Sequence, residues 1–286
     1  MLYPTAREWT DAAHKSVSIY GMSGLGKTYV SDLLRGTGNW FHYSVDYRIG
    51  TRYMGEHIVD NFKREAMKVP FLAELLKSDS IYIGSNITFE NLDPLSTYLG
   101  KPGDVDKGGI PIADYHARQE QHRRAEIAAL IDTVAFAKRA QDIYGYPHFV
   151  CDTGGSICEV VDPAAALDPV LDALDNATLP IWIKGTDDHV DELCRRFDRQ
   201  PKPMYYQPSE LETNWSDWLA ETGDAPEKVD PDAFIRWSFR RLIERRQGRY
   251  AAMAGRMGIT LEAADVATVR KAEDFVELVA AALPAS

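Results

Sequence analysis

A glycine-rich stretch near the N-terminus, Gly-Met-Ser-Gly-Leu-Gly-Lys-Thr at positions 21–28, fits the phosphate-binding pattern G-x-x-x-x-G-K-[ST] at every fixed position. Residues 16–20 before it read as a short strand, and residues 28–34 after it read as a helix with one apolar face. Glycines at these places allow successive backbone N–H groups to point at an anion. The stretch therefore predicts a strand, loop and helix that bind the phosphates of a nucleoside triphosphate.

Within this loop, two side chains have separate expected roles. Lys27 reaches the β- and γ-phosphates. The Thr28 hydroxyl takes one coordination position on Mg²⁺, next to the positively polarised helix N-terminus. The residues expected to contact the nucleotide are Gly21, Met22, Ser23, Gly24, Leu25, Gly26, Lys27, Thr28 and Tyr29.

The composition of the 286 residues excludes several classes of protein. Hydrophobic residues make up 45% and charged residues 26%, which is typical of a globular protein. The net charge of -11 argues against a chain whose main partner is nucleic acid. Cys151, Cys158 and Cys194 lack metal-ligand spacing, which is typical of a reducing compartment. Since no apolar run approaches the ~18 residues of a membrane span, we expect a cytoplasmic protein that does not engage a membrane.

A second chemical centre is expected at residues 148–156. An apolar strand there ends in Asp152, which is the usual source of a carboxylate that orients Mg²⁺. Gly154 and Gly155 follow, and they would let a substrate approach the backbone closely. The alternative is a structural turn that Asp152 caps.

A third centre is expected around Asp46, which follows a strand at residues 40–45. Ligands of open α/β sheets bind beyond the carboxyl ends of the strands, so Asp46 is placed to position or deprotonate a phosphoryl acceptor. Its alternative role is again a turn cap. Residues 55–77 read as a helix broken at Pro70, and its Lys63 and Arg64 either hold an anionic substrate or form a solvated face.

A cationic helix end is predicted at residues 187–199, which contain Arg195 and Arg199. A proline-bounded loop follows it. Such an arrangement suits a lid whose arginines close on the transferring phosphate. An exposed basic helix C-terminus explains it equally well, because cations are favoured there.

The rest of the sequence predicts secondary structure but no further site residues. We expect strands at 81–84, 180–184 and 258–262, helices at 113–144, 234–254 and 268–283, an irregular excursion at 86–112 and an acidic peripheral excursion at 207–231.

In their order along the chain, these pieces resemble the shikimate kinase branch of the small P-loop kinases, which also includes gluconate-kinase-like and nucleoside-monophosphate-kinase-like proteins. The resemblance implies a three-layer α/β fold with a five-stranded parallel sheet of order 2-3-1-4-5. It implies a single domain over residues 1–286, with a helical insertion at about 65–145, covering substrate or partner, and another at about 207–231.

The resemblance also implies roles for individual residues. The acceptor aspartate of the family looks like Asp46, and its substrate-holding arginine falls in Phe62-Lys63-Arg64. Its glycine run is similar to Gly154-Gly155. The remaining correspondences are the lid, which resembles Arg195-Arg196 with Lys202-Pro203, and a late arginine, which looks like Arg246 as a substrate contact.

Three positions depart from the family pattern. Ser44 stands for the first aspartate of an Asp-x-Asp pair, Lys202 for the lid arginine, and Ser156 for a third glycine. The chain is also far longer than the family. Shikimate itself is therefore not the expected substrate.

The function expected from these observations is ATP- and Mg²⁺-dependent transfer of the γ-phosphoryl group to a hydroxyl of a small, anionic metabolite. Lys27, Asp46, Arg195 and Arg199 are the expected catalytic residues. One alternative is an ATPase switch that acts through a protein partner bound to the insertion. Another is a kinase for a nucleotide or a nucleic-acid end, bound by the basic helix at 234–254.

Overall fold

A computed structural model describes residues 1–285, and the chain divides into two compact units. Unit 1 is made of Met1–Val45, Glu126–Gln200 and the residues from Arg236 onward, and unit 2 is made of Asp46–Ala125 and Pro201–Ile235. Residues 126–145 of the expected first insertion thus belong to unit 1.

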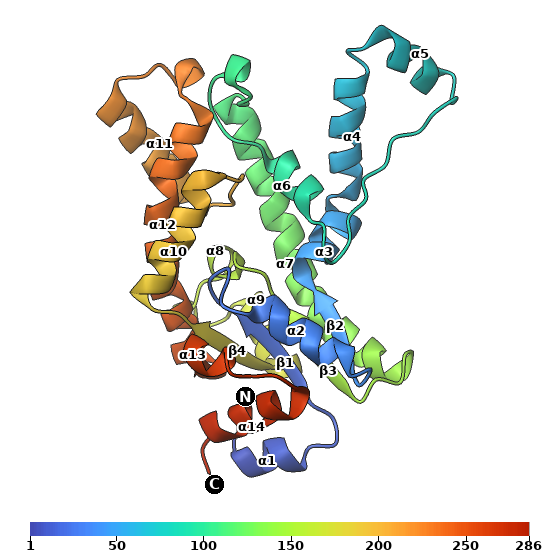
Figure 1. The fold of residues 1–286 in the computed structure, drawn as a ribbon, viewed down its shortest axis with the longest axis vertical. Helices are drawn as coiled ribbons and strands as arrows, with labels where there is room; N and C mark the ends of the chain where they lie inside the picture. The colour runs from blue at the N-terminus through green and yellow to red at the C-terminus, as the bar shows by residue number, and fades with distance from the viewer. Residues whose placement is uncertain (286) are drawn as a thin grey trace. The chain divides into compact units, whose positions relative to one another are not determined.

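Unit 1 is built on one parallel sheet with the strand order β2-β3-β1-β4-β5 (Figure 1). This confirms the expected fold class and order. The central strands are buried along nearly their whole length, as expected for a parallel sheet covered on both faces. The strands are β1 (Ser16–Tyr20), β2 (Trp40–Ser44), β3 (His148–Asp152), β4 (Leu179–Lys184) and β5 (Ile259–Glu262).

Helices cover both faces of the sheet, and the side chains of β2 show how. Phe41 and Tyr43 point to one face, where both rings pack against Phe136 of α7 (Ile112–Asp142). His42 points to the other face, toward Asp32 of α2 (Lys27–Gly36). Because side chains along the strand point alternately to the two faces of the sheet, helices pack on both faces, which gives the three predicted layers. The other helices of unit 1 are α1 (Ala6–Asp11), α8 (Ile157–Val160), α9 (Pro169–Ala177), α10 (Asp187–Arg199), α13 (Ala263–Val266) and α14 (Ala272–Ala282).

Unit 2 contains helices and irregular segments among its described residues. Its first element, α3 (Val45–Arg48), begins at the last residue of unit 1 and runs directly into a π-helix, η1 (Ile49–Tyr53). Two long helices are shared between the units in sequence: α7 enters unit 1 at Glu126, and α12 (Pro231–Arg256) enters it at Arg236. The others are α4 (Gly55–Ala66), α5 (Pro70–Lys77), α6 (Asp93–Leu99), η2 (Val105–Lys107), α11 (Pro208–Thr222) and η3 (Pro226–Lys228).

The segment at residues 201–207 is fixed inside unit 2. The Tyr115 hydroxyl and the Gln119 amide of α7 both donate to the backbone oxygen of Met204, at 2.8 and 2.9 Å. The backbone N–H of Tyr206 donates to the Gln119 side chain at 2.9 Å, and Tyr205 and Tyr206 are buried. The proline-bounded stretch that was expected to serve as part of a lid is therefore packed onto α7.

Two expectations about local structure are wrong. Residues 81–84 form no strand, and Tyr82 within them is 92% exposed, because no neighbouring strand accepts their hydrogen bonds. The excursion at 86–112 is not irregular throughout, because it contains α6 and η2. Residues 207–231, which were expected to form a peripheral excursion, contain α11, which buries Leu211 and Trp215. No helix within residues 1–285 is both long enough and apolar enough to span a bilayer.

Candidate active site

The phosphate loop connects β1 to α2, and its conformation requires glycine at two positions. Gly21 has φ +138°, and a Cβ built on it would lie 2.6 Å from the backbone oxygen of Ile183 on β4. Gly26 has φ +95° and precedes the first turn of α2. Both conformations are left-handed, which side chains rarely tolerate. The loop therefore passes close to β4 and delivers the helix N-terminus to the carboxyl edge of the sheet.

Lys27 is the first residue of α2, and its side chain folds back over the loop. Its Nζ donates a hydrogen bond to the Met22 backbone oxygen at 3.0 Å, and the residue is 7% exposed. A phosphate oxygen is a stronger acceptor than a carbonyl oxygen because it is charged. The ammonium group is thus held at the loop in a contact that a bound phosphate could replace.

Thr28 and Asp152 meet at the carboxyl edge of the sheet. The Thr28 Oγ1 donates to Asp152 Oδ2 at 3.1 Å, while Asp152 Oδ1 accepts from the Gly154 backbone N–H at 3.1 Å. Strand register places Asp152 beside Ile19, so its strand borders the one that leads into the phosphate loop. A hydroxyl and a carboxylate are the hard oxygen donors that Mg²⁺ prefers.

These two side chains fit Mg²⁺ held together with a nucleotide. The part of the chain that the structure describes contains no group of three or more His, Cys, Asp or Glu side chains suited to a metal ion. Mg²⁺ usually keeps waters and is bound through one or two carboxylates plus substrate phosphates. Thr28 and Asp152 would therefore supply the protein ligands, directly or through water.

The loop after β3 packs directly on the phosphate loop. A Cβ built on Gly155 would lie 3.2 Å from the Ser23 Oγ, which is tighter than an ordinary contact. The Gly155 backbone oxygen accepts hydrogen bonds from Arg246 Nη1, at 3.2 Å, and from the Tyr250 hydroxyl. Helix α12 thus fixes the position of the loop that packs on the phosphate loop.

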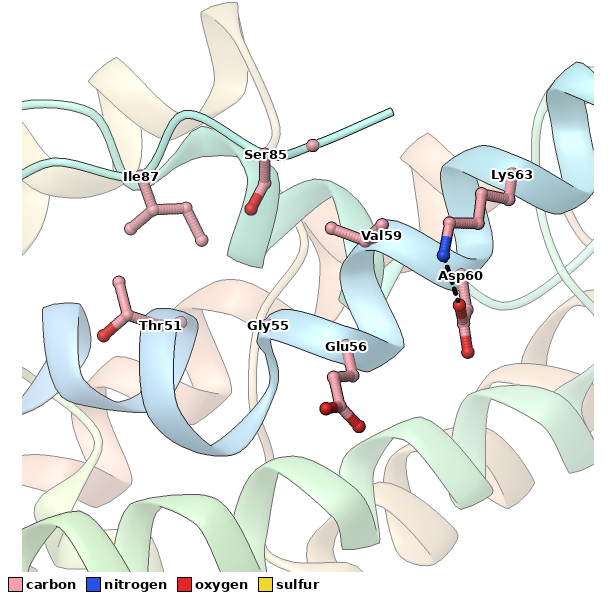
Figure 2. A pocket seen from close by; sticks show the side chains of 10 residues that line it. Thr51, Gly55, Glu56, Val59, Asp60, Lys63, Ser85 and Ile87 are labelled. Atoms are coloured by element: carbon pink, nitrogen blue, oxygen red, sulfur yellow. Dashed lines mark hydrogen bonds and ion pairs between the residues drawn. The ribbon is translucent and has the colours of Figure 1, made fainter. Parts of the chain in front are cut away.

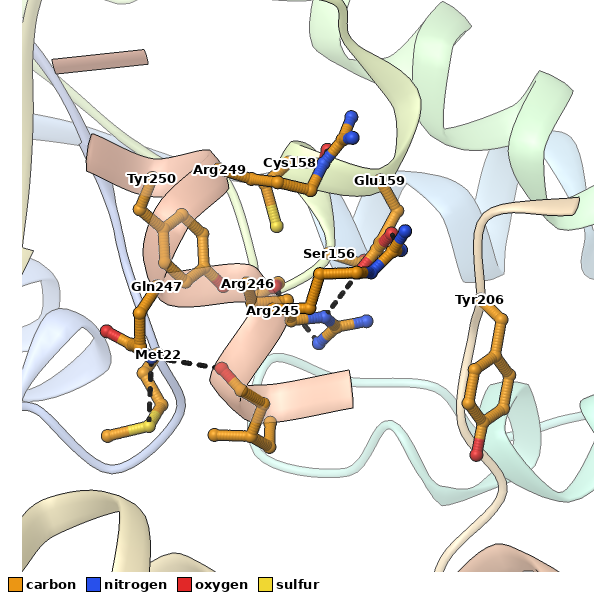
Figure 3. A network of polar contacts seen from close by, with 12 residues as sticks. Met22, Ser156, Cys158, Glu159, Tyr206, Arg245, Arg246, Gln247, Arg249 and Tyr250 are labelled. Atoms are coloured by element: carbon orange, nitrogen blue, oxygen red, sulfur yellow. Dashed lines mark hydrogen bonds and ion pairs between the residues drawn. The ribbon is translucent and has the colours of Figure 1, made fainter. Parts of the chain in front are cut away.

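Glu159 is the centre of the network that holds α12 there (Figure 3). Its carboxylate accepts from Arg246 Nε at 2.8 Å and from Arg245 Nη2 at 2.7 Å. Burial is the largest single influence on the pKa of Arg246 and would lower it, but Glu159, Cys158 and Tyr250 together oppose burial, and the pKa is raised. Burial also raises the pKa of Tyr250. Both groups therefore keep their donor protons across the physiological pH range.

This network gives the basic helix a role inside the protein. Arg249 donates to the backbone oxygens of Cys158 and of Val161, the latter at 2.8 Å. Arg246 is 4% exposed. Its guanidinium group is engaged with Glu159 and Gly155, and its predicted contact with a substrate stays a prediction.

Helix α10 carries three arginines in different surroundings. Arg195 is 65% exposed and pairs with Glu192 of the same helix at 2.7 Å. Arg199 is exposed. Arg196, in contrast, places Nη1 3.4 Å from the position that a Cβ on Gly24 would occupy, so its guanidinium borders the phosphate loop. The predicted roles of Arg195 and Arg199 at the transferring phosphate stay predictions, and Arg196 is the α10 arginine located at the loop.

The phase of the helix could have set Arg199 apart from the other two arginines, but it does not separate Arg196 from Arg195, which lie at similar angles from the buried face. The buried residues of α10 are Val190, Cys194 and Phe197. At about 100° per residue, Arg199 falls roughly opposite the centre of that face, whereas Arg196 falls nearer its flank. No comparable signal in the sequence pointed to Glu159.

The remaining predicted residues lie in unit 2. Asp46 is half-buried on α3, two residues after the end of β2. Lys63 and Arg64 are exposed on α4, and Lys63 Nζ lies 3.4 Å from Asp60 Oδ1. Lys63 also lines a cavity of 610 Å³, formed by η1, α4 and residues 84–87 (Figure 2).

No protein-family model matches the chain, and no curated protein matches it. Among solved structures, the chain is similar to shikimate kinase from Bacteroides thetaiotaomicron, with a TM-score of 0.36 and 12% sequence identity, over 93% of this chain and 94% of that one. That protein belongs to the family that the order of motifs resembles. At this distance the likeness assigns no residue a role, and the fold assignment rests on the strand order and the phosphate loop.

Proposed function

We propose that the protein is a kinase that binds ATP with Mg²⁺ and transfers the γ-phosphoryl group to a hydroxyl of a small molecule. The observation that carries the proposal is the 3.1 Å hydrogen bond from Thr28 Oγ1 to Asp152 Oδ2 beside the phosphate loop. It joins the two oxygen donors of an Mg²⁺ site at the point where the loop would hold the phosphates.

The residues of the loop supply binding and charge. Backbone N–H groups at the N-terminus of α2 and the Lys27 ammonium hold the β- and γ-phosphates. The guanidinium of Arg196 borders the same loop and offsets negative charge on the transferring group. Thr28 and Asp152 would hold Mg²⁺, which would supply positive charge that offsets the negative charge on the phosphate oxygens.

Asp46 is the proposed acceptor carboxylate. The acceptor oxygen forms a bond to the γ-phosphorus while the bond from that phosphorus to the bridging oxygen of ADP breaks, and the hydroxyl proton passes to the Asp46 carboxylate. The position of Asp46 in the sequence supports this role. Asp46 follows β2, and β2 is the neighbour in the sheet of β3, the strand that ends in Asp152.

The test is a screen of small molecules that reads ADP release, with Lys27→Ala as the blank. We expect ADP release that depends on an added hydroxyl compound and on Mg²⁺, and that falls about 100-fold in Asp46→Asn. As a control, Asp46→Asn should bind ATP with the same affinity as the wild type, which would show that its phosphate loop is intact.

Two outcomes would contradict a kinase that acts on a small molecule. ADP release that no added compound changes would favour an ATPase that acts through a protein partner. Salt-sensitive binding of oligonucleotides would favour a kinase for nucleic-acid ends. The arginines of α12 argue against a kinase for nucleic-acid ends, because they pair with carboxylates of the protein. Arg240 pairs with Asp191 at 2.9 Å, and Arg245 and Arg246 pair with Glu159.

A further inference from the structure

The cavity in unit 2 has the size of a metabolite site. Its volume is 610 Å³, within the range of about 300–1,000 Å³ that small-molecule sites occupy. One wall is the π-helix η1 and the first two turns of α4, and the facing wall is the segment 84–87 (Figure 2). A Cβ on Gly50 would lie 2.9 Å from Ile87 Cδ1, so the two walls approach closely at one end.

The charges around this cavity do not favour an anion. Three ionisable side chains line it: Glu56, Asp60 and Lys63. Lys63 Nζ lies 3.4 Å from Asp60 Oδ1, so the single cation already compensates one carboxylate (Figure 2). Glu56 forms no hydrogen bond or ion pair with any other residue of the described chain. The lining therefore carries a net formal charge of one negative unit.

The neutral polar atoms of the lining are suited to a ligand that carries hydroxyl groups. Thr51 Oγ1 donates its proton to the backbone oxygen of Tyr47 at 2.7 Å, which leaves its lone pairs as acceptors. Ser85, on the opposite wall, has a hydroxyl that can donate or accept. The uncompensated carboxylate adds further acceptors. These acceptors match a ligand that carries hydrogen-bond donors, namely hydroxyl groups and an ammonium group.

We propose that this cavity holds the acceptor of the phosphoryl transfer, and that the acceptor is a polyhydroxy compound with a positively charged amino group. The inference rests on the proposed function. The cavity begins at Gly50, one helical turn after Asp46 within the same unit, so the proposed base and the cavity are consecutive along the chain. The ammonium binds Glu56, and a hydroxyl elsewhere on the molecule is the group that reacts.

This assignment differs from what the resemblance implied. An anionic acceptor would need free cations, and Lys63 is paired with Asp60, while Arg64 does not line the cavity. An ammonium can instead donate a charge-assisted hydrogen bond to the Glu56 carboxylate without displacing an existing pair.

The test compares three open-chain polyols of equal carbon number that differ at one end only: glucamine with an ammonium, sorbitol with a hydroxyl and gluconate with a carboxylate. Binding to the full-length protein is measured by calorimetry without ATP. We expect glucamine to bind about tenfold more tightly than sorbitol, and gluconate to bind most weakly. In Glu56→Gln, glucamine should bind no more tightly than sorbitol.

Glu65→Gln is the matched control, because Glu65 lies on the same helix, pairs with Lys68 at 2.8 Å and does not line the cavity. It removes the same charge and should leave glucamine binding unchanged. Tighter binding of gluconate, glucamine binding that Glu56→Gln does not weaken, or no binding of any of the three would overturn the assignment. Glucamine that binds through Glu56 but is not phosphorylated, together with ADP release that no compound stimulates, would support the site and overturn the kinase.

Discussion

Glu159 Oε1 lies 2.8 Å from Arg246 Nε, and both side chains are buried. The two residues are far apart in sequence, and their contact joins α8 to α12. Because Arg246 and Tyr250 also hold the backbone oxygen of Gly155, the same contact fixes the loop that packs on the phosphate loop. Burying a charge costs free energy, and each member of this pair offsets the cost of the other.

Glu159→Gln should therefore destabilise the protein strongly. The change keeps the size of the side chain but leaves the guanidinium of Arg246 buried without its counter-charge. We expect the free energy of unfolding to fall by about 3 kcal/mol in chemical denaturation. Glu244→Gln removes an exposed partner of Arg240 on the same helix and should cost no more than about 0.5 kcal/mol. Equal effects of the two changes would contradict the importance of the buried pair.

Gly21→Ala should damage both folding and nucleotide binding. The new methyl group would lie 2.6 Å from the Ile183 backbone oxygen, and the backbone at φ +138° disfavours any side chain. We expect a loss of roughly 2 kcal/mol or more in stability and a loss of measurable ATP binding.

Gly36→Ala is the matched control for that change. Gly36 is the last residue of α2, and a Cβ built on it meets no atom within 4 Å. Alanine is the better helix former by about 0.5–1 kcal/mol, so this variant should be as stable as the wild type or more stable. A wild-type affinity for ATP in Gly21→Ala would show that the loop does not bind as proposed.

Asp152→Asn tests the Mg²⁺ site. The asparagine can still accept the hydrogen bond from Thr28 or from Gly154, so the loop should keep its shape, but the negative charge is lost. We expect the Mg²⁺ concentration for half-maximal ATP turnover to rise about tenfold to 100-fold. The measurement is a magnesium titration at saturating ATP. An unchanged midpoint would mean that Asp152 only caps its turn.

Much of unit 1 was predictable because its signals are local. The phosphate loop is a contiguous motif, and the strands beside it are short apolar runs bounded by turns. Asp152 and Thr28 could be expected to meet because parallel strands end at one edge. Helix α11 also had a signal that was missed: Leu211, Trp215 and Trp218 recur at helical spacing within an acidic stretch.

The rest could not be predicted because it depends on distant parts of the chain. Arginine-rich α12 looks like a solvated or nucleic-acid-binding helix until the carboxylate of Glu159, far away in sequence, is seen against it. Residues 81–84 have strand-forming side chains, but strand formation needs a partner edge, and none is present among the described residues around them. The pairing of Lys63 with Asp60 was readable as helical spacing, but the cavity beside it was not.

Acidification should weaken the fold through His42. Burial lowers the pKa of His42 below its ordinary value, an effect that Arg35 adds to and that Asp152 and Asp32 oppose. Between the lowered pKa and the value of about 6.5 in the unfolded chain, the unfolded state binds more protons. The stabilisation is therefore complete above about pH 6.5 and is lost as the pH falls below it.

We expect the free energy of unfolding to decrease from about pH 7.5 to about pH 5.5, and His42→Gln to make this decrease smaller. The exposed His57 provides the control substitution, His57→Gln, which should leave the slope unchanged. His148, whose pKa burial, Lys15 and His14 also lower, accounts for part of the remaining slope. A slope that is the same in the wild type and in His42→Gln would contradict this role.

Arg196 and Arg195 should differ in their effect on nucleotide binding although they are neighbours in sequence. Arg196 Nη1 borders Gly24 of the phosphate loop, whereas Arg195 extends from the helix to Glu192. A charge-assisted hydrogen bond to phosphate contributes roughly 1.5–3 kcal/mol, so Arg196→Met should weaken ATP binding by about tenfold or more. Methionine keeps the length of the side chain and removes the charge.

Arg195→Met removes the same charge one residue away and should change the affinity less than about twofold, since exposed pairs contribute little. Fluorescence titration with an ATP analogue measures both. The reverse order of effects would support Arg195 as the lid residue, and equal losses would indicate that the positive field of α10, rather than one contact, acts on the nucleotide.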